Sequence, residues 1–98
     1  MINSRLEEGF LELSSEVLRA IAHPIRIAII DLLHNKGKLS VTEIHQNLDI
    51  EQAIASHHLR ILKDKQILFS KREGKNTYYD LRAGSYAEII GTLEKVLK

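Results

Sequence analysis

Residues 51–66, EQAIASHHLRILKDKQ, decide the fold of this chain. At about 100° per residue of helix, the inward positions of this stretch fall on one face: Ala55, His58, Leu59 and Leu62. The opposite face is short, polar and partly basic: Gln52, Ala53, Ser56, His57 and Arg60. A helix needs such a face to enter the major groove of DNA and to hydrogen-bond base edges and phosphates. An isolated helix with this pattern more often has an ordinary solvated surface on its polar side. The segments on either side of residues 51–66 must therefore distinguish a DNA-binding face from a solvated one.

Two longer helices are predicted before this stretch. Over residues 3–22, apolar residues recur every three or four positions, at Leu6, Phe10, Leu13, Val17 and Ile21. Pro24 suits the first turn of a second helix, where its missing N–H costs nothing. That second helix is apolar along most of one side and ends before Gly37, which predicts a central position in the core.

Two capping-box patterns follow in quick succession. Ser40 with Glu43 predicts the start of a third helix at about residues 41–48, and Asp49 with Gln52 predicts the start of a fourth. Only a couple of residues separate these two helices. Two short helices joined by a tight turn are typical of a helix-turn-helix, in which the second helix enters the groove of DNA.

After Gln66 the apolar period changes from helical to strand-like. Residues 67–71 and 77–81 carry β-branched and aromatic residues, and the segment 72–76 between them is rich in glycine, asparagine and charge. This predicts a β-hairpin with a basic tip, in which either Tyr78 or Tyr79 faces inward. Residues 84–97 return to a helical pattern. The sequence therefore predicts a single domain, residues 1–98, that is mainly α with a small β-hairpin wing: four helices, two strands and a last helix.

Composition narrows the class of protein. The 98 residues are 44% hydrophobic, enough for one small core, and they contain no cysteine, which removes disulfides and thiolate chemistry. No apolar run is long enough to span a bilayer and no signal pattern begins the chain, so we expect a cytoplasmic protein.

The net charge of +1 is unevenly distributed. The segment from Arg60 to Arg82 contains seven basic and three acidic residues, whereas residues 1–33 contain three basic and five acidic ones. Such asymmetry predicts one surface for a polyanion and a different role for the N-terminal region.

Three motifs, in this order, resemble the ArsR family of bacterial transcriptional regulators. They are AHPIRIAII at residues 22–30, SHHLRIL at 56–62, and REGK at 72–75 followed by YYDL at 78–81. The resemblance covers about residues 12–82 and implies a winged helix-turn-helix. It also implies a sequence-specific regulator of double-stranded DNA, a repressor acting as a homodimer on a palindromic operator.

The resemblance assigns DNA contacts to the fourth helix and to the wing. Gln52, Ser56 and His57 match contact positions in the helix; Ala53 stands where many relatives have serine or threonine, so one polar contact is in doubt. The wing of the family reaches along the minor groove. The complete candidate set is Gln52, Ala53, Ser56, His57, Arg60, Lys63, Arg72, Lys75 and Asn76.

The chain departs from the family where metals bind. The thiolate positions of the family are occupied here by Ser40 and Thr42, which are poor ligands for soft metals. Of the other family site Asp80 remains, but Arg82 follows and residues 83–98 contain no histidine. The remaining histidines do not suggest a site either: His58 matches a core histidine, and the adjacent His57 points about 100° away. We therefore expect no metal and no cofactor.

The partner predicted for the terminal helices is a second copy of the chain. They offer more apolar surface than one small domain needs, which predicts a homodimer interface of Leu6, Phe10, Leu13, Val17, Tyr86, Ile89, Leu93 and Val96. The alternative is a monomer whose terminal helices cap the core.

Two other functions remain open from the sequence. One is a winged-helix module that docks another protein, which salt-sensitive binding to duplex DNA would distinguish. The other is a small hydrolase or metal enzyme, which the missing catalytic motifs disfavour, so we expect no enzyme. An effector could be a small molecule in the dimer interface or a protein partner, or there could be none.

Overall fold

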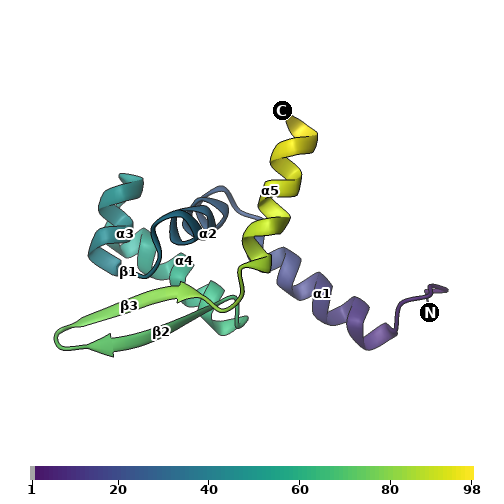
Figure 1. Ribbon diagram of the computed structural model, residues 1–98. Helices are drawn as coiled ribbons and strands as arrows, with labels where there is room; N and C mark the ends of the chain where they lie inside the picture. Colours follow the sequence, from purple (N-terminus) through teal and green to yellow (C-terminus); the bar gives the residue numbers. More distant parts are fainter. Residues whose placement is uncertain (1) are drawn as a thin grey trace.

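The computed structural model describes residues 2–98, and its helices and strands follow the predicted order with one addition (Figure 1). The elements are α1 (Glu8–Ile21), α2 (Pro24–Lys36), β1 (Leu39–Ser40), α3 (Val41–Leu48), α4 (Gln52–Asp64), β2 (Leu68–Glu73), β3 (Asn76–Leu81) and α5 (Ser85–Leu97). The mainly helical fold with a β-hairpin is confirmed. The predicted order of elements lacked β1, because a strand of two residues has no periodicity of its own.

The core lies where α2, α3 and α4 meet the base of the hairpin. Its fully buried side chains come from every one of these elements: Ile29, Ile30, Leu33, Ile44, Leu59, Leu62, Ile67 and Leu68. Burying one such side chain contributes about 1.5–3 kcal/mol, so this cluster is a large favourable term in folding. The prediction that the second helix is central is confirmed, since α2 contributes three of them.

The first helix is shorter than predicted. It begins at Glu8 rather than at residue 3, and Leu6 precedes it. The backbone N–H of Leu6 donates to the Oγ of Ser4 over 3.1 Å, a local side-chain contact that competes with helical hydrogen bonding. Leu6 therefore lies in a bend before α1, which corrects its assignment to the helix.

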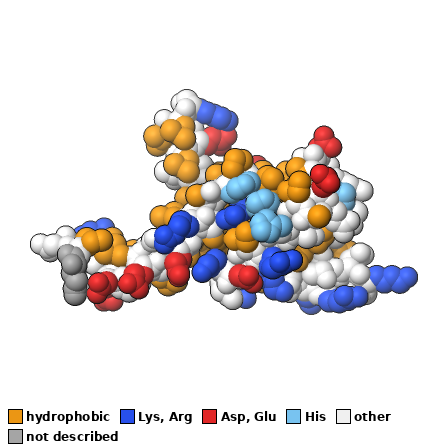
Figure 2. Space-filling model, turned by 180° about the vertical axis from the view of Figure 1, so that it is seen from behind, with side chains coloured by type: hydrophobic (Ala, Val, Ile, Leu, Met, Phe, Trp, Pro, Cys, Tyr) orange, Lys and Arg blue, Asp and Glu red, His pale blue; other side chains and the backbone are white. Residues whose placement is uncertain are grey.

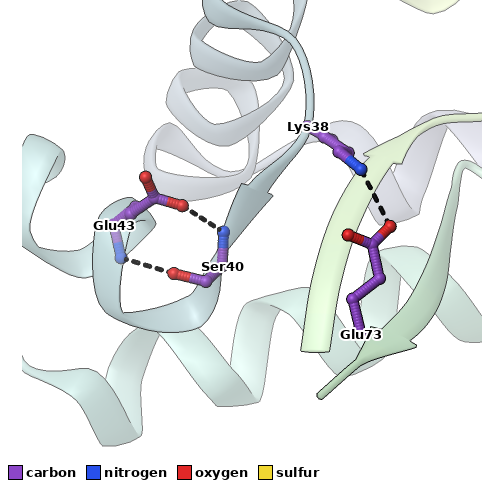
Figure 3. A network of polar contacts seen from close by, with 4 residues as sticks. All are labelled: Lys38, Ser40, Glu43 and Glu73. Atoms are coloured by element: carbon purple, nitrogen blue, oxygen red, sulfur yellow. Dashed lines mark hydrogen bonds and ion pairs between the residues drawn. The ribbon is translucent and has the colours of Figure 1, made fainter. Parts of the chain in front are cut away.

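The starts of α2 and α3 have the predicted chemistry. Pro24 occupies the first turn of α2, where Nδ1 of His23 accepts the N–H of Ile25 over 3.1 Å. At α3 the predicted capping box is present: Oγ of Ser40 accepts the N–H of Glu43, and the Glu43 carboxylate accepts the N–H of Ser40 (Figure 3). Two of the unpaired N–H groups at this helix end are thereby satisfied.

The second predicted capping box is wrong. Asp49 does not cap α4; it ends α3 in the left-handed conformation, with φ 54°. Glu51 instead precedes α4, and its side chain makes no capping hydrogen bond. Asparagine and aspartate tolerate the left-handed region better than most residues, so the same Asp that resembles a helix start also suits a helix end.

The sheet has the order β1-β3-β2 and is antiparallel throughout. Its hairpin is longer than predicted, because pairing continues as far as Glu73 opposite Asn76. Arg72 and Asn76 therefore belong to the strands, and the turn contains only Gly74 and Lys75. Gly74 has φ 63°, a conformation that glycine adopts without strain. We use "wing" for this hairpin, residues 68–81.

The terminal helices lie away from the wing. Figure 1 shows the wing tip at one end of the molecule and the N-terminal end of α1 at the other, with α5 rising from the body beside α2. The molecule measures 49 × 31 × 21 Å along its principal axes. Within residues 2–98, no helix combines the length and the apolar character needed to cross a bilayer.

Candidate nucleic-acid interface

A tight turn fixes α4 against α3. Asp49, Ile50 and Glu51 separate the two helices, and the N–H of Ile50 donates to the carbonyl of His45 over 3.1 Å. The ring of His45 contacts the same turn, with Nδ1 3.2 Å from the carbonyl oxygen of Ile50. Because both contacts come from the last turn of α3, the direction in which α4 leaves is set by hydrogen bonds as well as by packing. This is the predicted helix-turn-helix.

The inner face of α4 is buried as predicted. Ala55, Leu59 and Leu62 are wholly buried, and His58 is buried among them. The Nδ1 of His58 accepts a hydrogen bond from Nε of Arg26 in α2, over 3.1 Å. The prediction of a core histidine with a satisfied ring nitrogen is therefore confirmed, and the outer face of α4 is left toward solvent.

His58 is held neutral by its surroundings. Burial is the largest cause that lowers its pKa below the ordinary value of 6.5, followed by His23, Arg26 and His57. The His23 ring lies 4.3 Å from the His58 ring between centroids, and the His57 ring meets it edge-on at 5.0 Å. A neutral ring keeps Nδ1 free to accept the Arg26 N–H, so the low pKa and the hydrogen bond support each other.

The outer residues of α4 form one continuous polar strip, which we call the contact face: Gln52, Ala53, Ser56, His57, Arg60 and Lys63. Ser56 is half-buried and the others are exposed. None of them forms an ion pair within residues 2–98, so their donors are not committed to carboxylates there. The structure brings together all six residues that the sequence assigned to this helix.

The wing carries the other three predicted residues at its tip. Arg72, Lys75 and Asn76 are exposed, and Nε of Arg72 donates to the carbonyl of Gly74 over 3.3 Å. β2 packs against α4, so the wing and α4 are neighbours. In Figure 2 blue side chains gather below the histidines and out to the wing tip. Several red ones follow α1, and others stand above and to the right of the histidines. The basic cluster predicted from the sequence is thus gathered on one side of this face.

One residue at this surface was missed by sequence reasoning. Lys38, in the loop before β1, places Nζ 2.8 Å from Oε2 of Glu73 in the wing (Figure 3). The ammonium also lies 5.4 Å from the ring centroid of Tyr78. The contact raises the pKa of Lys38 and lowers the pKa of Glu73, in both cases chiefly through their hydrogen bond. No sequence signal marked it, because only the pairing of β1 with β3 brings the two segments together.

The residues at the family's metal positions have other contacts here. Ser40 caps α3, and Oδ1 of Asp80 accepts the N–H of Leu81 over 2.8 Å. Arg82, beyond Asp80, lies with its guanidinium carbon 6.0 Å from the ring centroid of Phe69. Across the described residues 2–98, no three histidine, aspartate or glutamate side chains converge as metal ligands would.

The predicted dimer residues divide into two groups. Phe10, Leu13, Leu93 and Val96 are 53%, 61%, 46% and 73% exposed, which is unusual for large apolar side chains. Val17, Tyr86 and Ile89 are half-buried and pack against the core of their own chain. Leu6 is half-buried in the segment before α1. The exposed residues lie on α1 and α5, the helices that lead away from the wing (Figure 1).

Comparison of the sequence with known proteins gives consistent matches. A family model described as a bacterial regulatory protein of the arsR family matches residues 23–69. The transcriptional repressor PagR of Bacillus anthracis is 32% identical over 95 residues, which cover 97% of this chain and 95% of PagR. The similarity therefore extends over both terminal helices and not only over the helix-turn-helix.

Solved structures agree with the sequence matches. The crystal structure of PagR has a TM-score of 0.80 and 34% identity, and the match covers 89% of this chain and 99% of that one. The solution structure of a homodimeric winged helix-turn-helix DNA-binding domain from Mycobacterium bovis, described as a possible ArsR-family regulator, has a TM-score of 0.81 at 26% identity. That match covers 99% of this chain and 89% of the other.

Proposed function

This chain belongs to the arsR family of bacterial regulatory proteins, and we propose that it represses transcription by placing α4 of each subunit of a homodimer in the major groove of an operator. The observation that supports the proposal most directly is that α4 is amphipathic. Its inner face is buried and hydrogen-bonded, whereas its outer face presents polar side chains that have no ion-pair partner within residues 2–98. A helix held in this way can enter a groove without rearranging the core.

The contact face offers groups that suit base edges. The Gln52 amide can pair with N6 and N7 of an adenine, and the Ser56 hydroxyl can serve a base or a phosphate. The His57 ring can donate to an acceptor in the groove or on the backbone. The methyl group of Ala53 suits the methyl group of a thymine, in place of the polar contact that many relatives have at this position. These assignments rest on exposure and on matching motif positions.

The basic side chains around the contact face suit phosphates. Arg60 and Lys63 follow the same strip of α4 toward its C-terminal end, and Lys75 extends from the wing turn. The N-terminus of α4 has no side-chain cap, so its first N–H groups and its positive dipole end add to the attraction. We place the wing tip, with Arg72, Lys75 and Asn76, along the neighbouring minor groove.

The dimer that we propose joins α1 and α5 of one subunit to the same helices of its partner. The exposed apolar residues of these helices, with Phe10 and Leu13 on α1 and Leu93 and Val96 on α5, form its centre. A two-fold axis there would set the two α4 helices about 34 Å apart, one turn of DNA, and so require a palindromic operator. The described residues 2–98 thus make one domain with dimerisation helices at both ends.

Protein docking without DNA binding is the other function that a winged helix allows. The matched relatives named as transcriptional repressors and the basic cluster gathered on one side of the face in Figure 2 favour DNA. The chain's relatives are transcriptional regulators, and we infer no enzymatic activity for it. We also propose that release from DNA does not use either of the family's metal sites, since Ser40 and Asp80 are occupied by backbone hydrogen bonds.

Selection of bound genomic fragments tests the proposal. Purified protein is incubated with sheared genomic DNA, bound fragments are sequenced, and the affinity of the enriched site is measured as salt is raised. We expect an imperfect palindrome with half-sites about one helical turn apart and an affinity that falls steeply with salt. Enrichment of no common sequence, with weak binding that depends on charge alone, would favour the protein-docking alternative.

A further inference from the structure

Lys38 connects a segment outside the proposed DNA contacts to the wing. It lies between α2 and β1, and its ammonium reaches Glu73, the last residue of β2, at 2.8 Å. The same ammonium nitrogen lies 5.4 Å from the ring centroid of Tyr78 in β3. A single side chain therefore touches both strands of the wing from the body of the domain, as Figure 3 shows for the Glu73 contact.

Glu73 is the residue of the wing that needs such a partner. It immediately follows Arg72 and precedes the turn of Gly74 and Lys75, so its carboxylate stands in the segment proposed to approach phosphates. An unpaired carboxylate there would repel the DNA backbone. Lys71 lies on the same face of β2 and also favours the ionised form, but within residues 2–98 the only ion pair of Glu73 is with Lys38.

We propose that Lys38 is a positioning residue for DNA binding: by pairing with Glu73 it keeps that carboxylate from repelling the DNA phosphates that Lys75 approaches. The inference rests on the proposed function of the wing. Lys38 makes no contact with DNA in this account, because its ammonium is directed to Glu73. Its effect on the operator passes through the Glu73 carboxylate.

Folding does not explain the contact. The side chains of Lys38 and Glu73 are 56% and 40% exposed, and an exposed ion pair contributes little to stability because solvent screens it. Charges at the rim of an interface act instead on association and on its dependence on salt. Breaking the ion pair of Lys38 with Glu73 should therefore change the affinity for DNA rather than the unfolding temperature.

A double-mutant cycle on the selected operator tests the proposal. Lys38→Ala should weaken binding by about three- to fivefold at low salt, the range expected for one exposed charge pair. Glu73→Gln should bind at least as tightly as the wild type, because it removes the repelling charge. In the Glu73→Gln background, Lys38→Ala should then have less than about a twofold effect. An equal loss in both backgrounds would mean that Lys38 contacts DNA directly and would overturn the proposal.

Three controls make the outcome specific. Lys38→Arg should keep wild-type affinity, because a guanidinium also pairs with a carboxylate; loss of binding in this variant would count against the pair. Lys36→Ala removes an exposed charge two residues away that has no ion pair within residues 2–98, and should change nothing. The thermal midpoint of Lys38→Ala should equal that of the wild type, and a fall large enough to explain the weaker binding would overturn a positioning role.

Lys75→Ala separates failure of this inference from failure of the proposed function. If Lys75→Ala weakens binding and Lys38→Ala does not, the wing contacts DNA and only the role of Lys38 is wrong. If neither variant weakens binding, the wing does not contact this DNA, and both the placement of the wing and the role of Lys38 fall. The double variant Gln52→Ala/His57→Ala would still test α4 independently.

Discussion

The guanidinium of Arg26 hydrogen-bonds the buried ring of His58, with Nε 3.1 Å from Nδ1, and so ties α2 to the inner face of α4. The same guanidinium donates through a second nitrogen to the carbonyl of Ala20 at the end of α1, over 3.0 Å. One side chain therefore joins three helices, including the proposed dimerisation helix and the proposed DNA-reading helix. Its loss leaves a buried ring nitrogen and a helix-end carbonyl without their donor.

Arg26→Ala should lower the free energy of unfolding by about 1–3 kcal/mol, the cost of unpairing buried polar groups. Urea denaturation followed by circular dichroism measures it. Arg19→Ala is the matched control, because Arg19 is an exposed arginine whose side chain bonds only Ser15 within residues 2–98. Arg26→Ala and Arg19→Ala proteins of equal stability would show that the contact with His58 is not structural.

His58 also makes stability depend on pH. Its pKa in the folded protein is lowered, first by burial and then by His23, Arg26 and His57, so the unfolded chain binds more protons on mild acidification. The stabilisation is complete above the unfolded value of 6.5 and is lost as the pH falls through the lower value of the folded state.

The wild type should therefore lose more stability between about pH 8 and pH 5 than a His58→Gln variant, whose side chain does not titrate. Urea titrations at several pH values measure the difference. His34→Gln, at an exposed histidine, should follow the wild type. Parallel curves for the wild type and His58→Gln would contradict the prediction.

The proposed dimer depends on apolar side chains that charge would disrupt. Leu13→Glu or Leu93→Glu should give a monomer in light scattering at micromolar concentration, because each places a carboxylate in the centre of the apolar contact. Glu12→Lys changes the charge on the opposite side of α1 and should remain dimeric. Circular dichroism should be unchanged in all three, since the altered side chains are exposed. A monomeric mass for the wild-type protein in the same experiment would contradict the proposed interface.

Local patterns in the sequence predicted most of the fold. Pro24, Gly37 and the Ser40–Glu43 capping box each impose a conformation through their own chemistry, and the structure has the predicted helix boundaries at these residues. Asp49 misled because aspartate suits both ends of a helix, and only its φ of 54° distinguishes them. The later start of α1 goes with a hydrogen bond between Leu6 and the Ser4 side chain, which apolar spacing does not reveal.

The sequence predicted the part of the candidate site that lies on a single helix. It did not predict the side-chain contacts that join separate helices and strands. Helical spacing was enough to separate the contact face of α4 from Ala55, Leu59 and Leu62. Spacing says nothing of partners distant in sequence, so the contacts of Arg26 with His58 and of Lys38 with Glu73 appeared only in the folded chain. Both arise where separate elements meet, and a single sequence carries no signal for such pairs.

The central claim is that the outer face of α4 reads the operator. The most direct test is a fluorescence titration of the double variant Gln52→Ala/His57→Ala against the selected operator and against a scrambled duplex. Each substitution should weaken operator binding by about 1–3 kcal/mol while the scrambled duplex is bound as by the wild type, so discrimination between the two duplexes should be lost. Operator binding equal to that of the wild type, in a protein with an unchanged fold, would contradict the claim.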